Sequence, residues 1–587
     1  QNLGPKAYNI LSKIYYSSLE SSTVPKPLLS MKAVFLPKDN KPDKSNPKSY
    51  RPITLSSFLL KGLERILQWR LQSTILRQPL ANQHAYTKSR SCDSALSEAI
   101  HIIERNKFYG NFTVIVSLDC SGAFDNLTYR GALKAMELHK VPALITKWYH
   151  NLLSNRKVKL EHNGELLNIR PTRGSPQGGV LSPLIWNLLM DAIQDLLKGR
   201  PVKAIVYADD ILLICGGIDP DTIVSQMQKA LNDITGWGSD NGLHFNPDKT
   251  QCCHILPGRP KIMWPRLRLG QKTMEYQDHF TYLGVRVESN LKWHNHIKEK
   301  CDKAKRLLNM CKAVVGQEWG LDPAKVLWIH EAIIRPKITY GSIIWAHDIT
   351  AISQARLNSV QRQSLLSATH AMRSTPTAGM EAIMGVKPLH IFALETALKS
   401  AYRLKNQFNW QRRFISNSHR EEYLNLLSQV EPIVHLPQPT TFEINRLVPQ
   451  AELEDSVLNI FTDGSKDGSD SGFGWCIATN DHVITDFSQS LEPTSSPYMA
   501  ELVALSSCLG HLLEWDLDPT WSTIIWTDSL SAVEALKAPI INHPLVKEVH
   551  DLLVKVGALI PLNLRWIRGH NNSTGNEYAD FLAKKAD

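Results

Sequence analysis

Three aspartates stand beside apolar runs in the first half of the chain. Residues 114–125 (VIVSLDCSGAFD) predict a buried strand that ends at Asp119. The sequence AIVYADDILLIC predicts two half-strands around Asp209 and Asp210, which places this pair at a hairpin tip. Carboxylates are costly in apolar surroundings unless cations compensate them, and hard divalent cations bind oxygen ligands. Two such ions on adjacent strands are the arrangement that drives in-line nucleotidyl transfer.

Four more acids in the last quarter of the chain are expected at strand ends or in helices of a unit with the order β-β-β-α-β-α-β-α. They are Asp463, Glu501, Asp528 and Asp580. The first and third end apolar strands (VLNIFTD and TIIWTD), Glu501 is expected in the first turn of a helix over residues 497–513, and Asp580 lies inside the last helix. Converging on one face, these acids would form a second two-metal site. Any one of them alone could be a helix cap or a surface acid.

The composition is that of a globular protein with more than one domain. The chain has 587 residues, of which 43% are hydrophobic and 21% charged, so two to four domains are expected and a disordered or fibrous protein is excluded. No run approaches 18 apolar residues, which predicts no membrane span. Nine scattered cysteines without a C-x-x-C pair favour reduced thiols in an intracellular protein over a zinc site. Since Gln1 opens the chain, we expect a fragment or a processed product of a longer protein.

The charge is distributed unevenly along the chain. The net charge is +10, but the residues from Asp455 onward carry 8 basic and 18 acidic side chains, and the preceding part carries 58 and 38. A basic body with an acidic tail indicates that the body binds a polyanion. Four prolines between residues 432 and 449 predict a linker between the two parts. A helix is predicted over residues 58–76, with an apolar face made of Leu59, Leu63, Ile66, Leu67 and Leu71.

The segment between the two aspartate strands, residues 173–191 (RGSPQGGVLSPLIWNLLMD), contains a glycine pair that lets backbone approach closely and a helix that begins at Pro183. With the aspartate strands it resembles the polymerase core of reverse transcriptases, and S-P-Q-G-G-V-L-S-P is similar to the non-LTR (LINE-type) retrotransposon branch of the jockey/I-factor type. Retroviral enzymes carry a different version. SYRPI and QHAYTKSRSCDSAL upstream resemble the family's finger motifs, and GLHFNPDKT and YLG downstream resemble its lysine motif and primer grip.

The resemblance implies a role for each matching residue. Asp119, Asp209 and Asp210 would hold two metal ions, and Lys249 would protonate the leaving pyrophosphate. Phe124 would exclude a ribose 2′-hydroxyl, although a plain core aromatic is the alternative. The remaining implied substrate contacts are Gln177 and Gly178 at the templating base pair, Arg51, Lys88 and Arg90 at the incoming triphosphate, and Tyr207. Ser89 stands where the family usually has glycine, which stiffens the loop that carries Lys88 and Arg90.

The last part of the chain resembles RNase H. The signatures T-D-G-S, M-A-E-L, T-D-S and G-H followed by G-N-E-Y-A-D occur in the family's order. The resemblance implies that Asp463, Glu501, Asp528 and Asp580 are metal ligands and that His570 is the mobile histidine that helps to protonate or release the product. Arg568 replaces the usual proline before Gly-His, so the pose of His570 is expected to differ.

Together the two resemblances imply a multidomain α+β fold, made of a right-hand polymerase with fingers, palm and thumb, a helical connection and a C-terminal RNase H-like α/β domain. The expected boundaries are 1–118 for an N-terminal extension and fingers, 119–288 for the palm with fingers elements, 289–350 for the thumb, 351–450 for the helical connection and linker, and 451–587 for the RNase H domain.

The function that these resemblances imply is RNA-directed DNA synthesis coupled to cleavage of RNA in RNA–DNA hybrids. Each site would use two Mg²⁺ ions, with Mn²⁺ as the alternative. The expected partners are an RNA template, a DNA primer, the hybrid, dNTPs and an element-encoded nucleic-acid-binding protein, with no membrane. We expect a cytoplasmic ribonucleoprotein that enters the nucleus for integration. The nicking endonuclease that normally precedes the polymerase is not in this sequence. The alternative is a domesticated, catalytically inactive nucleic-acid-binding protein.

Overall fold

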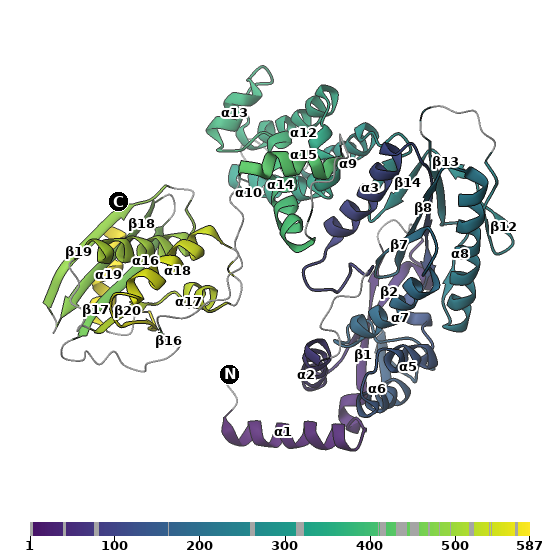
Figure 1. The fold of residues 1–587 in the computed structure, drawn as a ribbon, viewed down its shortest axis with the longest axis horizontal. Helices are drawn as coiled ribbons and strands as arrows, with labels where there is room; N and C mark the ends of the chain where they lie inside the picture. Colours follow the sequence, from purple (N-terminus) through teal and green to yellow (C-terminus); the bar gives the residue numbers. More distant parts are fainter. Residues whose placement is uncertain are drawn as a thin grey trace. The chain divides into compact units, whose positions relative to one another are not determined.

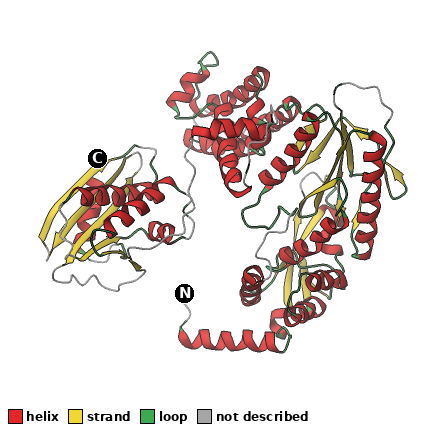
Figure 2. Cartoon of the chain, viewed as in Figure 1, coloured by secondary structure: helices red, strands yellow, loops and turns green. Residues whose placement is uncertain are grey.

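The computed structural model divides the chain into two compact units, Gln1–Ser428 and Gln429–Asp587. It describes residues 4–38, 43–74, 82–162, 164–256, 258, 264–312, 322–408, 410, 418–429, 443–445, 457–467, 470–479, 482–492, 495–515, 522–538, 541, 543–569 and 573–586. Figure 1 shows their elements, and Figure 2 shows how helices and strands alternate along them.

The centre of the first unit is a sheet in the order β13-β10-β3-β8-β7. Its strands are β3 (Phe112–Leu118), β7 (Val202–Tyr207), β8 (Asp210–Gly217), β10 (Gln251–Ile255) and β13 (Tyr276–Gln277). The apolar run of β3 is explained by burial on both faces, because Val114 and Val116 belong to one hydrophobic cluster and Ile115 to another. We call this sheet the palm sheet, after the domain expected there. It includes β3, whereas the expected boundary between fingers and palm falls directly after this strand, at residue 118.

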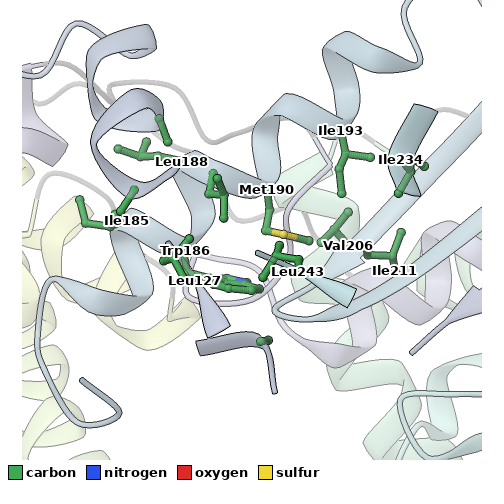
Figure 3. Packing of buried hydrophobic residues seen from close by; sticks show 14 of the residues in the cluster. Leu127, Ile185, Trp186, Leu188, Met190, Ile193, Val206, Ile211, Ile234 and Leu243 are labelled. Atoms are coloured by element: carbon green, nitrogen blue, oxygen red, sulfur yellow. The ribbon is translucent and has the colours of Figure 1, made fainter. Parts of the chain in front are cut away.

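Helices cover both faces of this sheet. The first cluster is built around α7 and includes residues of the other helices that follow β3; these helices are α4 (Ala123–Asn126), α5 (Tyr129–Leu138), α6 (Ala143–Asn155), α7 (Ser182–Leu196) and α8 (Pro220–Asp240). Figure 3 shows part of this cluster, where Trp186 and Met190 of α7 lie with Val206, Ile211 and Leu243. The other face is covered by α3 (Cys92–Phe108) and the elements that follow β13.

A smaller sheet in the order β2-β1-β5-β6 is built from two strands that precede β3 and two that lie between β3 and β7 in the chain. Its strands are β1 (Ser30–Pro37), β2 (Tyr50–Leu55), β5 (Lys157–His162) and β6 (Glu165–Ile169), and the helices beside it are α1 (Pro5–Glu20) and α2 (Phe58–Thr74). α2 confirms the predicted helix, but the predicted face is partly wrong: Leu59 and Ile66 are 49% and 45% exposed. The buried stripe is Leu60, Leu63, Leu67 and Leu71, which keeps the i, i+3, i+4 spacing better.

The remainder of the first unit is mainly helical. It also contains three two-stranded sheets. They are β4 (Cys120–Ser121) with β9 (His244–Phe245), β11 (Arg268–Leu269) with β12 (Lys272–Thr273), and β14 (His279–Tyr282) with β15 (Val285–Glu288). The helices are α9 (His294–Lys312), α10 (Pro323–Ile329), α11 (Arg335–Thr339), α12 (Ala351–Thr369), α13 (Thr377–Ile383), α14 (Leu389–Phe408) and α15 (His419–Leu426). They gather at one end of the unit (Figure 1), and α15 packs against α3 through an ion pair between His419 and Glu104 of 2.8 Å.

The second unit is a mixed sheet in the order β16-β21-β20-β17-β18-β19. Its strands are β16 (Glu443–Asn445), β17 (Val457–Asp467), β18 (Asp470–Thr479), β19 (His482–Ser490), β20 (Ser522–Thr527) and β21 (Leu562–Trp566). Its helices are α16 (Pro497–Glu514), α17 (Leu530–Lys537), α18 (Pro544–Gly557) and α19 (Thr574–Lys585). Leu458 and Ile460 pack with α16 and α18 on one face, while Val457 and Phe461 pack with α19 on the other.

Two elements of this unit differ from the sequence prediction. The predicted order lacks α18, which begins at Pro544, a residue suited to the first helical position. It also lacks β16, a short segment of the expected linker that pairs in parallel with β21. The rest of the expected linker, apart from these three residues, lies outside the described residues.

Among the residues that the structure describes, no helix is both long and apolar enough to cross a membrane. The nine cysteines carry free thiols.

Candidate active sites

The acids of the first unit meet at one end of the palm sheet. Asp119 directly follows β3, Asp209 lies in the turn after β7, and Asp210 begins β8. β3 and β8 are antiparallel, and Leu118 pairs with Ile211. Asp119 follows Leu118 and Asp210 precedes Ile211, so the two aspartates fall at the same end of the strand pair. The predicted hairpin tip is confirmed, since Tyr207 pairs with Asp210 across the turn.

The carboxylates of this end of the sheet disfavour one another's charge. Burial, followed by the charges of Asp209 and Asp119, raises the pKa of Asp210 to about 6. Burial also raises the pKa of Asp209, and the nearby Arg51 opposes that shift. Such a set is stabilised by cations, and hard divalent ions fit an all-oxygen donor set.

A lysine compensates the third carboxylate. Lys249 Nζ lies 3.3 Å from Asp119 Oδ2, and the backbone N–H of Asn246 donates to the carbonyl of Asp119. The loop with the predicted proton donor is therefore attached to the strand end that carries Asp119. Among the described residues, the three palm acids do not form a group with all ligand atoms within 4.8 Å of one another, in keeping with the pairing of Asp119 to Lys249.

Phe124 is half-buried in an aromatic stack beside this site. Its ring stacks on Trp186, with centroids 4.7 Å apart and an interplanar angle of 26°. The ring of Tyr86 also contacts Phe124, edge-on, with centroids 6.5 Å apart and an interplanar angle of 86°. Phe124 thus contacts one buried and one exposed aromatic, a geometry that suits both a substrate-facing residue and a core aromatic. The sequence analysis missed Tyr86 and Trp186. They could have been found as the aromatic residues of the motifs QHAYTKSRSCDSAL and RGSPQGGVLSPLIWNLLMD.

The loop with the glycine pair, Gly178 and Gly179, lies against β2 of the smaller sheet. The backbone N–H of Thr54 in β2 donates to the carbonyl of Gln177 at 2.7 Å, and Gln177 Nε2 donates to Asp125 Oδ1 at 2.8 Å. Gly178 has φ +118°, and a Cβ at this position would lie 2.6 Å from the Thr54 carbonyl oxygen. Glycine is required here by both conformation and space. In this structure the closely approaching backbone is β2.

The basic residues expected at the triphosphate are placed differently from one another. Arg51 and Lys88 are exposed, and the Arg51 charge reaches Asp209. Arg90 is half-buried and its Nη1 donates to the Gln83 carbonyl at 2.7 Å, so its guanidinium is engaged inside the loop. Ser89 has φ +68°, the left-handed conformation that explains why the family favours glycine there. Tyr207 is half-buried at the end of β7.

In the second unit, three acids form a compact cluster. The carboxylate oxygens of Asp463 (β17), Glu501 (α16) and Asp528 (after β20) lie within 4.8 Å of one another. Glu501 falls in the second turn of α16 rather than the first, because this helix begins at Pro497. The helix approaches the strand closely, since a Cβ on Gly464 would lie 2.4 Å from the Glu501 backbone nitrogen.

The electrostatics of this cluster fit a cation site. Burial and the charges of Asp463 and Asp528 raise the pKa of Glu501 to about 9. Burial and the charges of Asp528 and Asp580 raise the pKa of Asp463 to about 7. Glu501 Oε2 is buried and has no hydrogen-bond partner among the described residues. An unpaired buried carboxylate oxygen beside two other carboxylates is the donor set that a divalent ion completes.

The remaining two predicted residues of this site are placed less fully. Asp580 lies in α19, where it pairs with Lys584 Nζ at 2.7 Å, and its charge reaches Asp463. His570 lies outside the described residues. The residue before it, Gly569, packs so close to Asp528 that a Cβ there would lie 2.8 Å from Asp528 Oδ2.

Comparison with known proteins agrees with the division of the chain into two units, because each matching family model falls within one of them. Residues 37–287 match the family model described as reverse transcriptase (RNA-dependent DNA polymerase), and residues 455–587 match the model of RNase H. The chain is similar to the 115 kDa protein of the type-1 retrotransposable element R1DM of Drosophila melanogaster, at 26% identity over 62% of this chain and 35% of that protein. It is also similar to the Pol polyprotein from the element R1 of Bradysia coprophila, at 24% identity over 61% of this chain and 36% of that protein.

Among solved structures, RNase H1 from the archaeon Halobacterium salinarum NRC-1 matches 22% of this chain and 96% of its own, with 18% identity and a TM-score of 0.19. The chain spans about a third of the length of the two curated relatives above.

Proposed function

We propose that this chain, which joins a reverse transcriptase domain to an RNase H domain of the kind found in non-LTR retrotransposon Pol polyproteins, copies RNA into DNA and cleaves the RNA of the resulting hybrid. The observation that carries the proposal is the presence of two separate acidic centres in one chain. One is at the palm hairpin with Asp210, and the other is the cluster around Glu501.

In the polymerase centre, Asp119, Asp209 and Asp210 would hold two Mg²⁺ ions, which when bound activate the primer 3′-hydroxyl and stabilise the leaving pyrophosphate. Phe124 would exclude a ribose 2′-hydroxyl by its position in the aromatic stack. Arg51 and Lys88 would attract the incoming triphosphate. Lys249 Nζ, which pairs with Asp119, would give its proton to the pyrophosphate.

In the nuclease centre, Asp463, Glu501 and Asp528 would hold the ions, with Asp580 as the fourth ligand. The ions would activate a water for attack on the RNA phosphodiester. Lys584 competes for Asp580 through its 2.7 Å ion pair, so it neutralises this carboxylate until the site is loaded. His570 would help to protonate or release the product.

The two domains imply nucleic-acid substrates. We expect the template to be RNA, the primer to carry a DNA 3′-end and the nucleotides to be dNTPs. An element-encoded nucleic-acid-binding protein would accompany the chain in a cytoplasmic ribonucleoprotein that later enters the nucleus, and a fluorescent fusion expressed with its RNA tests this.

The test is extension of a DNA primer annealed to end-labelled RNA, scored for DNA product and RNA fragments in one reaction. We expect both products with Mg²⁺ and neither with a chelator. A folded chain that binds the hybrid yet yields neither product would favour the inactive nucleic-acid-binding protein.

A further inference from the structure

The backbone of Ala208, the residue before Asp209, is held on both sides by buried side chains. Its N–H donates to Gln83 Oε1 at 3.2 Å, and its carbonyl accepts from Trp186 Nε1 at 3.0 Å. Gln83 and Trp186 are 2% and 0% exposed. Ala208 has φ +54°, a left-handed conformation that is strained for a non-glycine residue. The turn that presents Asp209 is therefore a strained peptide with two fixed hydrogen bonds.

Gln83 reaches this turn from a segment that runs beside β7. The N–H of His84 donates to the Val206 carbonyl at 2.8 Å, and the N–H of Val206 donates to the Asn82 carbonyl at 3.0 Å. Gln83 Oε1 also accepts from the N–H of Ala85 at 3.0 Å. Two N–H donors point at this atom, which fixes the amide with its oxygen toward Ala208.

The Gln83 side chain makes its hydrogen bonds through the oxygen alone. Gln83 Nε2 is buried and has no hydrogen-bond partner in the described part of the chain. This unsatisfied donor offsets part of what the two bonds to the oxygen contribute to stability. The side chain therefore acts through what its oxygen holds.

Trp186 connects the turn to the predicted ribose-selecting residue. Its indole stacks on Phe124 at 4.7 Å while its Nε1 binds the Ala208 carbonyl. It is one of the side chains drawn in the core of Figure 3, on helix α7. Tyr86, three residues after Gln83, contacts the same Phe124 ring edge-on. The two hydrogen bonds on Ala208 and the aromatic stack thus form one connected set.

We propose that Gln83 and Trp186 are positioning residues of the polymerase site, which hold the Ala208 peptide so that the carboxylates of Asp209 and Asp210 keep one geometry. The inference rests on the proposed polymerase activity. Reacting groups displaced by about 1 Å lose about 100-fold in rate, so loosening this turn acts on catalysis more than on folding.

The first test replaces Trp186 by phenylalanine, which keeps a ring against Phe124 and removes the Nε1–H donor. The matched control is Trp148→Phe. Trp148 is also 0% exposed, belongs to the same hydrophobic cluster and donates one indole hydrogen bond, at 3.0 Å to Ser18 Oγ. We expect Trp186→Phe to lower kcat for RNA-templated extension about 10- to 100-fold with the KM for dNTP within about threefold. Trp148→Phe should lower Tm by a similar amount and leave kcat unchanged.

The second test measures the turn itself, without metal or substrate. Gln83→Met removes the acceptor of the Ala208 N–H. Hydrogen exchange of a peptide spanning residues 206–211 should therefore accelerate about fivefold in chelator, the factor that corresponds to the loss of one net hydrogen bond of about 1 kcal/mol. The Ala85 N–H loses the same acceptor, so its exchange should also accelerate. It is the internal control for removal of the Gln83 oxygen. The Gln83→Met, Trp186→Phe double variant should lose less activity than the product of the single losses, since both side chains bind the backbone of one residue, Ala208.

Unchanged exchange at residues 206–211 in Gln83→Met would overturn the proposed restraint. Accelerated exchange with wild-type kcat in both single variants, or equal kcat loss in Trp148→Phe, would overturn the positioning role. A wild-type chain that extends no primer would overturn the proposed function and the catalytic part of this inference with it, while exchange alone would still decide whether the hydrogen bonds hold the turn.

Discussion

Replacing Glu501 by glutamine should make the metal-free second unit more stable while it removes hybrid cleavage. Glutamine keeps the shape of the side chain and carries no charge. Burial and the neighbouring Asp463 and Asp528 raise the pKa of Glu501 to about 9, so the charged form is strongly disfavoured in the folded protein. Removing that charge relieves a cost that only a bound cation would otherwise offset.

The magnitude follows from the difference in pKa between the folded and unfolded states. In an unfolded chain a glutamate titrates near 4.5. Taking up a proton at pH 7 costs about 1.4 kcal/mol for each unit above that value, or about 3 kcal/mol, which is the upper bound of the gain. Because the folded-state pKa is raised, the folded protein binds more protons, and its stability falls as pH rises between about 4.5 and 9. The gain from glutamine should therefore grow with pH and vanish near pH 4.5.

The assay is thermal unfolding of the full chain in chelator at pH 5, 6, 7 and 8. We expect Glu501→Gln to raise the Tm of the second unit by about 5 °C at pH 7 and by little at pH 5. The control is Glu514→Gln at the exposed end of the same helix, which should change Tm by less than about 1 °C. Adding Mg²⁺ should stabilise the wild type more than Glu501→Gln. A gain that is absent, or that is equal at pH 5 and pH 8, would refute the argument from burial and repulsion.

Three further outcomes test other parts of the account. Phe124→Ala should raise the ratio of ribonucleotide to deoxyribonucleotide incorporation, and an active variant with an unchanged ratio would leave Phe124 as a core aromatic. Gly178→Ala should destabilise the first unit by about 2 kcal/mol, because φ +118° is strained for alanine and its Cβ would lie 2.6 Å from the Thr54 carbonyl; a denaturation midpoint equal to wild type would contradict this. The acidic second unit, residues 429–587, should bind an RNA–DNA hybrid weakly by itself, whereas the full chain should bind tightly with a steep salt dependence, each phosphate contact adding roughly −0.9 to the slope of log K against log salt. Equal affinities and slopes would show that the second unit carries its own binding surface.

The sequence predicted elements best where one periodicity dominates. β3 and the hairpin of β7 and β8 were predicted from continuous apolar runs, which the structure explains by burial on both faces of the palm sheet. The face of α2 was partly wrong, because Leu59 and Ile66 are apolar but exposed, and the sequence does not say which of two adjacent apolar stripes meets the core. β16 could not be predicted, since three residues gain their strand conformation only by pairing with β21, more than a hundred residues away.

The candidate sites divide in the same way. Acids that follow a strand, such as Asp119 and Asp463, are conspicuous because a charge interrupts an apolar run. Gln83 and Trp186 were missed because their importance lies in a hydrogen bond to one peptide, and a buried tryptophan looks like any core residue in sequence. Arg90 stays a predicted triphosphate contact. The bond from its Nη1 to the Gln83 carbonyl is set by the local turn, which residue type alone does not predict.

Two independent acidic centres in one chain are tested most directly by a reciprocal pair of substitutions, assayed on one labelled RNA–DNA substrate. Asp210→Asn should abolish DNA synthesis and leave RNA cleavage at the wild-type rate. Asp528→Asn should abolish RNA cleavage and leave primer extension intact. Loss of both activities from either substitution, in a protein whose unfolding transition is unchanged, would contradict the account.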